Sequence, residues 1–83
     1  LVVVEANNAA PVADFYHGSF YRFHWYVSTS FDTDGEIAEQ NWQFSNGHSS
    51  NRDSVFLVST EELGVTLTVK DDQGAVSTKA YTP

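Results

Sequence analysis

Residues 63–69 alternate between apolar side chains and small or polar ones at every position. The apolar set consists of Leu63, Val65, Leu67 and Val69, and the other set of Gly64, Thr66 and Thr68. Successive side chains of a β-strand point to opposite faces, so this period of two predicts a strand with one buried face. The chain is therefore expected to build its core from sheets.

Turn signals divide the rest of the chain into short segments of the same kind. The expected strands cover residues 12–15, 20–28, 37–45, 55–58, 63–69 and 75–82. Breaks are expected at 17–19, 30–36, 46–47 and 71–74; Asn46-Gly47 predicts a type I′ hairpin, and residues 59–62 predict a single helical turn. About seven short strands at this spacing describe an all-β, two-sheet sandwich.

Eighty-three residues suffice for one domain with an efficient core. The sequence is 41% hydrophobic and 14% aromatic, and large aromatic rings supply most of the area that such a core buries. There is no cysteine, which excludes both a disulfide framework and a thiolate zinc site. Residues 8–83 are expected to form the domain, and residues 1–7 the end of a linker or an edge strand.

The formal charge of −7 makes nucleic acid an unfavourable partner. No apolar run approaches the roughly 20 residues that a membrane helix needs, so membrane insertion is not expected. The first residues, LVVV, lack the basic region of a signal peptide. We therefore expect a monomeric domain taken from a longer polypeptide, whose neighbouring domains are among its partners.

The aromatic run 20–28 also alternates, and it divides its side chains into two faces. The expected core face carries Tyr21, Phe23, Trp25 and Val27; the other face carries Phe20, Arg22, His24, Tyr26 and Ser28. A one-residue bulge would instead bring Trp25 to the surface. Exposed rings on a rigid sheet suit stacking on sugar rings or packing against a protein fibre. In the segment 37–45, Trp42 and Phe44 are expected inside together with Gln40.

Asp32 and Asp34 flank a turn, where alternate carboxylates can direct several oxygens at one cation. Calcium takes 6–8 oxygen ligands, so further ligands would have to come from Asn7 or Asn8, from Asp71 or Asp72, from carbonyl groups and from water. The spacing excludes an EF-hand, because position twelve of such a loop would be an asparagine between strands. The alternative is that both carboxylates only cap the turn.

Catalysis is not expected. His17, His24 and His48 fall in different predicted segments, and the sequence contains no nucleophile elbow. The carboxylates of residues 32–36 lie at a single turn, with nothing to raise the pKa of an acid partner. A sandwich of this size also has little volume for a cleft that excludes water.

The order of the motifs resembles a PKD domain, the immunoglobulin-like module named after polycystic kidney disease protein. The matching segments are NNAAPVADF (7–15), STSFDTDGEI (28–37), NWQFSNG (41–47) and LGVTLTVKDDQGA (63–75). The family's Trp-Asp-Phe-Gly-Asp-Gly hallmark keeps Trp42, Phe44 and Gly47 but not its acidic positions. Leu63 replaces a tyrosine that is usual in the family, so a tyrosine-corner hydrogen bond is not available there.

The resemblance implies a non-catalytic accessory module of a larger secreted or surface hydrolase, of protease or chitinase type. It implies weak binding of an insoluble polymer, with protein fibres such as collagen ahead of chitin, through Phe20, Trp25 and Tyr26. It also implies a structural calcium ion near the N-terminal segment, with Asn8, Asp32, Asp34 and Asp72 as ligands. The alternative function is a structural linker or an adhesion module that has no polymer ligand.

Overall fold

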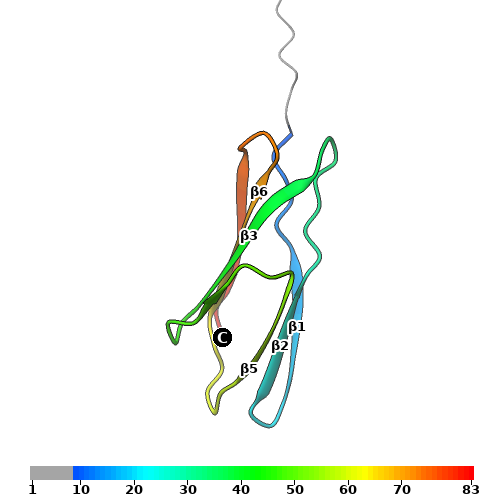
Figure 1. Cartoon of the computed structure of the whole chain (residues 1–83). Coiled ribbons are helices and arrows are strands. Elements are labelled where there is room, and N and C mark those ends of the chain that lie inside the picture. Colours follow the sequence, from blue (N-terminus) through cyan, green and yellow to red (C-terminus); the bar gives the residue numbers. More distant parts are fainter. Residues whose placement is uncertain (1–8) are drawn as a thin grey trace, which may run out of the picture.

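The computed structural model describes residues 9–83, which form seven β-strands and no helix (Figure 1). The strands are β1 (Phe15–Phe20), β2 (Phe23–Ser28), β3 (Ile37–Phe44), β4 (Ser49–Ser50), β5 (Ser54–Val58), β6 (Val65–Asp71) and β7 (Val76–Tyr81). The segment predicted as a linker or an edge strand lies outside the described residues. A helix of the length and hydrophobicity that a bilayer requires is absent from residues 9–83.

The strands form two antiparallel sheets, which confirms the predicted sandwich. One sheet has three strands in the order β1-β2-β5, and the other has four in the order β4-β3-β6-β7. The longest pairing joins β3 to β6 and contains a single irregularity between Ile37 and Glu39. The alternation of residues 63–69 behaves as predicted, since Leu63, Val65, Leu67 and Val69 are all buried.

The core is built around Trp42, which is fully buried between the two sheets. Its ring stacks on Phe15 of the other sheet at a centroid distance of 5.3 Å, and its Nε1 donates a hydrogen bond of 2.6 Å to the Arg52 carbonyl. Tyr26 packs on Phe44 at 4.9 Å. These contacts confirm Trp42 and Phe44 as the inward anchors of β3.

The prediction for the two faces of β2 was wrong. Tyr26 is only 2% exposed, whereas Trp25 is 37% exposed and Phe23 is 40% exposed. The register is regular on both sides of β2, so the whole strand is inverted and no bulge is involved. The alternation itself is correct, but both sets of side chains contain large aromatic rings, and a period of two does not say which set faces the core.

The inversion begins at an unexpected hairpin turn. Residues 21 and 22 connect β1 to β2, and Tyr21 adopts a φ of 57°. A left-handed conformation is uncommon for a bulky residue, and neither glycine nor asparagine marks this turn in the sequence. The predicted strand 20–28 is therefore divided at the turn. The predicted break at 17–19 is absent, because β1 runs through Gly18.

Two other turns differ from their predictions. In the hairpin between β3 and β4 only Gly47 has a positive φ, of 90°, so the turn is a three-residue loop and not the two-residue type I′ form. Residues 60 and 61 form a bend in place of the predicted helical turn, because the Ser59 hydroxyl bonds to the backbone of Glu61. Ser49–Ser50 forms β4 between the expected strands 37–45 and 55–58, where no strand was predicted.

Side-chain contacts close one open side of the sandwich, between β1 and β7. Lys79 lies 2.7 Å from the Asp14 carboxylate and also sits 5.8 Å from the centre of the Phe15 ring. The hydrogen bond from Lys79 is the main reason that the pKa of Asp14 is lowered. His17 packs on Tyr81 at 4.3 Å on the same side. The side chains of Lys79 and His17 thus cover the core on this side of the sandwich.

Candidate functional site

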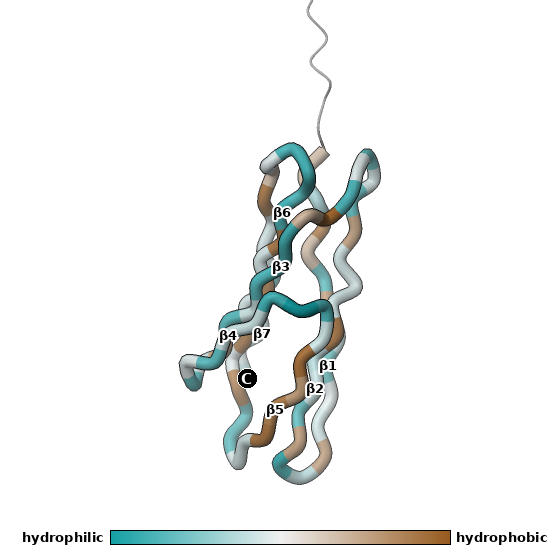
Figure 2. The backbone as a smooth tube through the Cα atoms, in the orientation of Figure 1, coloured by the Kyte–Doolittle hydropathy of each residue, from teal (hydrophilic) through white to brown (hydrophobic). Residues whose placement is uncertain are grey.

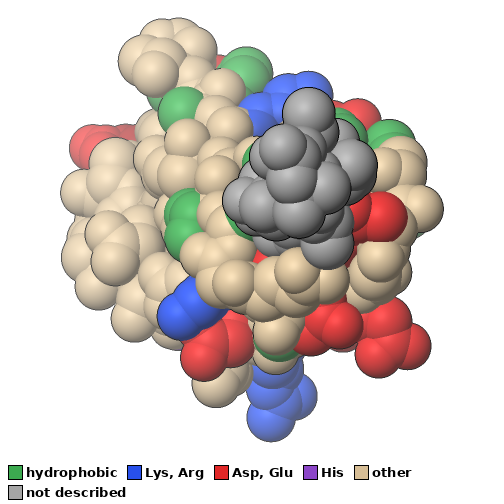
Figure 3. Space-filling model, turned by 90° about the horizontal axis from the view of Figure 1, so that it is seen from above, with side chains coloured by type: hydrophobic (Ala, Val, Ile, Leu, Met, Phe, Trp, Pro, Cys, Tyr) green, Lys and Arg blue, Asp and Glu red, His purple; other side chains and the backbone are tan. Residues whose placement is uncertain are grey.

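Three carboxylates meet at the end of the sandwich where the described residues begin. Figure 3 shows Asp and Glu side chains gathered on this end of the molecule. Asp32 comes from the β2–β3 loop, and Asp71 and Asp72 come from the end of β6 and its turn. One carboxylate oxygen of each lies within 4.8 Å of the others. The backbone joins the two loops, because the Asp72 amide donates to the Glu36 carbonyl at 3.1 Å. We call these three residues the acidic corner.

Gly35 permits this approach. A Cβ atom at that position would lie 2.8 Å from Asp72 Oδ1 and 3.2 Å from Asp32 Oδ2. The Asp-Gly turn therefore does more than bend the chain, because it leaves the space that the carboxylates occupy. A larger residue at 35 would displace the Asp72 carboxylate from this position.

The Asp32 carboxylate is in an unfavourable environment for a negative charge. Its pKa is raised, first because burial removes water from it, and then because of the neighbouring Asp34 and the charge of Asp71. Its Oδ2 atom is buried and accepts no hydrogen bond from the described residues. A divalent cation at the acidic corner would relieve both conditions.

The predicted metal ligands are only partly brought together. Asp32 and Asp72 lie in the acidic corner, whereas Asp34 instead accepts a 2.7 Å hydrogen bond from the Ala9 amide. Asn8 lies outside the described residues. Asp71 is fully buried, and its Oδ1 also accepts bonds from the amides of Gln73 and Ala75, so it has a structural role in the turn as well. At the other turn, the Asp34 amide lies 3.4 Å from Asp32 Oδ1, which is the kind of contact that the turn-capping alternative predicted.

A second candidate site covers the outer surface of the three-stranded sheet. The register places one set of side chains on this side of β1, β2 and β5, away from the core: Tyr16, Gly18, Phe20, Phe23, Trp25, Val27, Ser54, Phe56 and Val58. None of these side chains is charged, and Phe20 and Phe56 are both 62% exposed. Hydrophobic residues run along β5 in Figure 2. We call this surface the outer aromatic face.

Trp25 lies at the centre of the outer aromatic face. Its neighbours across the sheet are Gly18 on β1 and Phe56 on β5. Phe56 in turn stacks on Phe23 at a centroid distance of 5.9 Å and an angle of 27°. The rings therefore form a continuous patch across two strands.

The sequence identified this patch incompletely. Phe20 and Trp25 lie on the outer aromatic face, but Tyr26 does not, because its ring is in the core and burial raises the pKa of its hydroxyl. Phe23 and Phe56 were missed. Alternation alone would have placed Phe23 beside Trp25, whereas the position of Phe56 depends on β5 pairing with β2, which no local signal reveals.

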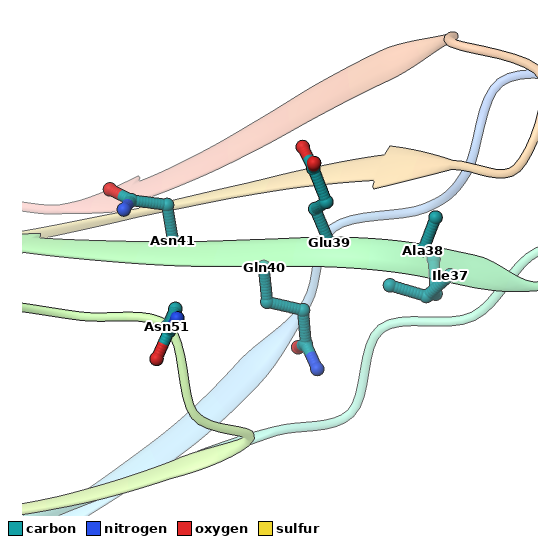
Figure 4. Close-up of a pocket in the computed structure, with 6 residues that line it drawn as sticks. All are labelled: Ile37, Ala38, Glu39, Gln40, Asn41 and Asn51. Carbon is teal, nitrogen blue, oxygen red and sulfur yellow. The ribbon is translucent and has the colours of Figure 1, made fainter.

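A groove of about 620 Å³ is lined by β2, by β5 and by residues 48–52. Trp25 and Phe56 border it, and its polar lining includes His48, Arg52 and Ser54. Hydrogen-bonding groups therefore lie beside the aromatic rings. A smaller pocket of about 330 Å³ lies along β3, where Gln40 points away from Glu39 and Asn41 (Figure 4).

The three histidines have different structural partners. His17 packs against Tyr26 and Tyr81, and His48 against Phe44. His24 is buried, with its Nε2 3.0 Å from the Ser59 carbonyl. Each ring is thus engaged in packing or in a backbone contact.

A scan against models of protein families finds no match, and a search of curated proteins finds none. Among solved structures, the PKD1 domain of Vibrio anguillarum Epp matches with 34% identity and a TM-score of 0.86, over 93% of this chain and 94% of that one. The PKD1 domain of the Vibrio cholerae metalloprotease PrtV matches with 35% identity and a TM-score of 0.82, over 90% and 95% of the two chains. This chain belongs to the PKD domain family.

As a PKD domain, the chain is an accessory domain and not a catalytic one, which confirms the predicted class. A third match is a solved structure of carbohydrate-binding modules from the β-sandwich superfamily. It shows 26% identity and a TM-score of 0.79 over 90% of this chain, which spans 34% of that one.

Proposed function

We propose that this PKD domain serves a larger secreted hydrolase by spacing its domains and by weakly binding an insoluble polymer through the outer aromatic face. The observation that carries the proposal is the exposure of Phe20, Phe23, Trp25 and Phe56 on one uncharged sheet surface. Related domains in a metalloprotease and in carbohydrate-binding modules support an accessory role of this kind.

The physical argument rests on the cost of exposed apolar area. An antiparallel sheet that packs on one face normally presents polar side chains on the other. Here the outer side of β2 carries Phe23 and Trp25 where such a sheet would carry polar residues. Large contiguous apolar patches mark interaction surfaces in soluble proteins, and flat rings suit a broad polymer surface better than a small ligand.

We further propose that calcium binds at the acidic corner and fixes the incoming segment. Asp32, Asp71 and Asp72 would supply carboxylate oxygens, and Asn8 remains a predicted ligand. Asp34 would act beside them, since it already holds the Ala9 amide. Such an ion would stiffen the connection to a preceding domain, which is a useful property in a spacer.

The alternative is a spacer or adhesion module with no polymer ligand. The acidic corner serves that alternative equally well, because it concerns the connection between domains. Only the role of the outer aromatic face distinguishes the two functions. In a spacer or adhesion module, its rings would pack against a neighbouring domain, and the isolated domain would have no affinity for a fibre.

Co-sedimentation of the isolated domain with insoluble collagen and with chitin tests the proposal. We expect pelleting with one polymer, and a loss of pelleting in the variant Phe56→Ala. Phe31→Ala is the matched control, because Phe31 is 50% exposed but lies in the β2–β3 loop. Failure of the wild-type domain to pellet with either polymer would remove polymer binding and leave the spacer function.

A further inference from the structure

Gly18 and Trp25 form a directly opposed pair across β1 and β2. A Cβ atom built on Gly18 would lie 2.5 Å from Cζ2, 2.6 Å from Cε2 and 2.8 Å from Nε1 of Trp25. Three indole atoms are thus nearly equidistant from one point above the glycine. The Nε1–Cε2–Cζ2 edge of the indole therefore lies over Gly18, in space that any other residue would fill with its side chain.

This contact restricts where the indole can lie. The ring covers Gly18 of β1 and is still 37% exposed. An aromatic ring that covers a strand glycine is a known way of packing sheets. Here the consequence is an exposed aromatic plate at the centre of the outer aromatic face.

The charge distribution limits what such a plate can bind. The face itself carries no charged side chain, while the domain as a whole carries −7. The charge of the domain repels an acidic polymer. The face has no charged side chain that could pair with a charged polymer, so a neutral polymer is its complementary ligand.

Polar groups line the groove that Trp25 and Phe56 border. They include His48, Arg52 and Ser54, which can donate and accept hydrogen bonds. A pyranose ring has an apolar C–H face and a rim of hydroxyl groups. Trp25 would meet the C–H face, and the polar groups of the groove would bind hydroxyl groups of the same polymer.

We propose that Gly18 is a positioning residue that holds Trp25 in place as a stacking plate for the pyranose rings of a neutral polysaccharide. The proposal rests on the polymer-binding function proposed above and names its substrate class. A protein fibre of the polyproline type is the less suitable ligand, because such helices dock in grooves between aromatic rings. A ring that covers Gly18 leaves no groove on its inner side.

The orientation of the ring can be measured without any ligand. Protons that lie over the face of an indole are shifted upfield in the NMR spectrum, so the Hα protons of Gly18 are expected upfield in the wild-type domain. The shift is expected to disappear in Trp25→Ala. Ordinary Hα shifts for Gly18 in the wild-type domain would overturn the stacked geometry and the proposal with it.

Binding isotherms on chitin test the role of Gly18. Gly18→Ala displaces the ring but retains the tryptophan, so we expect it to weaken binding about three- to tenfold, close to the effect of Trp25→Ala. The double variant is expected to bind no more weakly than Trp25→Ala alone, because Gly18 acts only through the ring. Gly64→Ala is the matched control, since a Cβ there meets its nearest neighbour at an ordinary 3.6 Å.

The outcomes separate this inference from the proposed function. Wild-type affinity in Gly18→Ala, or a further loss when it is added to Trp25→Ala, would overturn the role of Gly18. Pelleting with collagen but not with chitin would overturn the polysaccharide class and leave polymer binding intact. Pelleting with neither would remove both proposals. Melting temperatures of all variants, measured in parallel, identify any loss of affinity that comes from unfolding.

Discussion

Asp32 occupies a position where a negative charge is costly unless a cation is present. Burial and two neighbouring carboxylates raise its pKa, and the absence of a side chain at Gly35 lets Asp72 come close to it. The folded state therefore binds a proton at Asp32 more readily than the unfolded state does. The contribution of Asp32 to the free energy of unfolding therefore increases as the pH falls through its raised pKa. This contribution is lost at neutral pH.

The variant Asp32→Asn should accordingly change the response to calcium. In chelator at pH 7 we expect its melting temperature to equal or exceed that of the wild type, because the crowded charge is gone. Millimolar calcium should raise the melting temperature of the wild type but not of the variant, since an ion that binds only the folded form stabilises it. Melting curves with and without chelator provide the measurement.

Lowering the pH supplies an internal check on that result. In chelator, the advantage of Asp32→Asn over the wild type should shrink between pH 7 and pH 4, as Asp32 takes up its proton. If the melting-temperature difference between Asp32→Asn and the wild type grew on acidification, the pKa of Asp32 would not be raised in the folded state. A wild-type melting temperature that calcium leaves unchanged would contradict the metal site itself.

Gln40 is the second residue whose environment predicts a measurable effect. Its side-chain oxygen is buried and accepts no hydrogen bond from the described residues. An unsatisfied buried acceptor costs about 1–3 kcal/mol, so Gln40→Leu should increase the free energy of unfolding by roughly 1 kcal/mol in urea titrations. Gln43→Leu, at an exposed position of the same strand, should change it by less than about 0.5 kcal/mol. A Gln40→Leu variant that is less stable than the wild type would contradict this prediction and indicate that the Gln40 amide has a hydrogen-bond partner.

Among the elements, β3 determines how the two sheets are joined. Trp42 stacks on Phe15 of the opposite sheet and donates to the Arg52 carbonyl, at the point where the chain leaves β4 for β5. A single side chain thus connects both sheets and the crossing between them. This explains why β3 serves as the anchor of the fold and contributes no side chain to the outer aromatic face.

Trp42→Phe should therefore affect stability and not the binding surface. The variant loses the hydrogen bond to Arg52 and leaves a cavity, which together cost about 2–4 kcal/mol. Chemical denaturation measures this loss. Below its melting temperature the variant should still bind polymer as the wild type does, in contrast to Trp25→Ala. Loss of binding in a folded Trp42→Phe domain would contradict the division between core and surface.

Local patterns predicted the elements better than they predicted the faces. The strand over 63–69 and the inward positions of Trp42 and Phe44 follow from alternation, because only one set of side chains in those segments is apolar. In β2 both sets are aromatic, and the inner set is chosen by contacts with Val55 and His17, which are distant in sequence. The hairpin at Tyr21 was missed for a related reason, since it lacks the residues that usually permit a positive φ.

At the scale of the whole molecule, the fold was predictable from the order of the motifs and the site was not. Seven strands with regular turns specify a sandwich, and the spacing of the hallmark residues indicates the PKD family. The outer aromatic face, in contrast, collects Phe20, Trp25 and Phe56 from three strands. Its existence depends on which strands become neighbours, and that information lies in the assembled sheet.

The molecule also separates its two candidate sites. The loops of the acidic corner lie at the end where the described chain begins, and the β1–β2 hairpin lies at the opposite end (Figure 1). The aromatic patch extends toward that hairpin through Phe20 and Phe23. The carboxylates proposed to bind calcium are thereby kept away from the surface proposed to meet the polymer.

The most direct test of the outer aromatic face uses the two tryptophans as reporters in one NMR titration. Trp25 is exposed on the face, whereas Trp42 is fully buried in the core. On addition of a soluble chitin hexamer, we predict that the indole N–H signal of Trp25 shifts in proportion to occupancy and that the signal of Trp42 stays in place. An unchanged Trp25 signal at saturating oligosaccharide, or shifts confined to the acidic corner, would contradict the account.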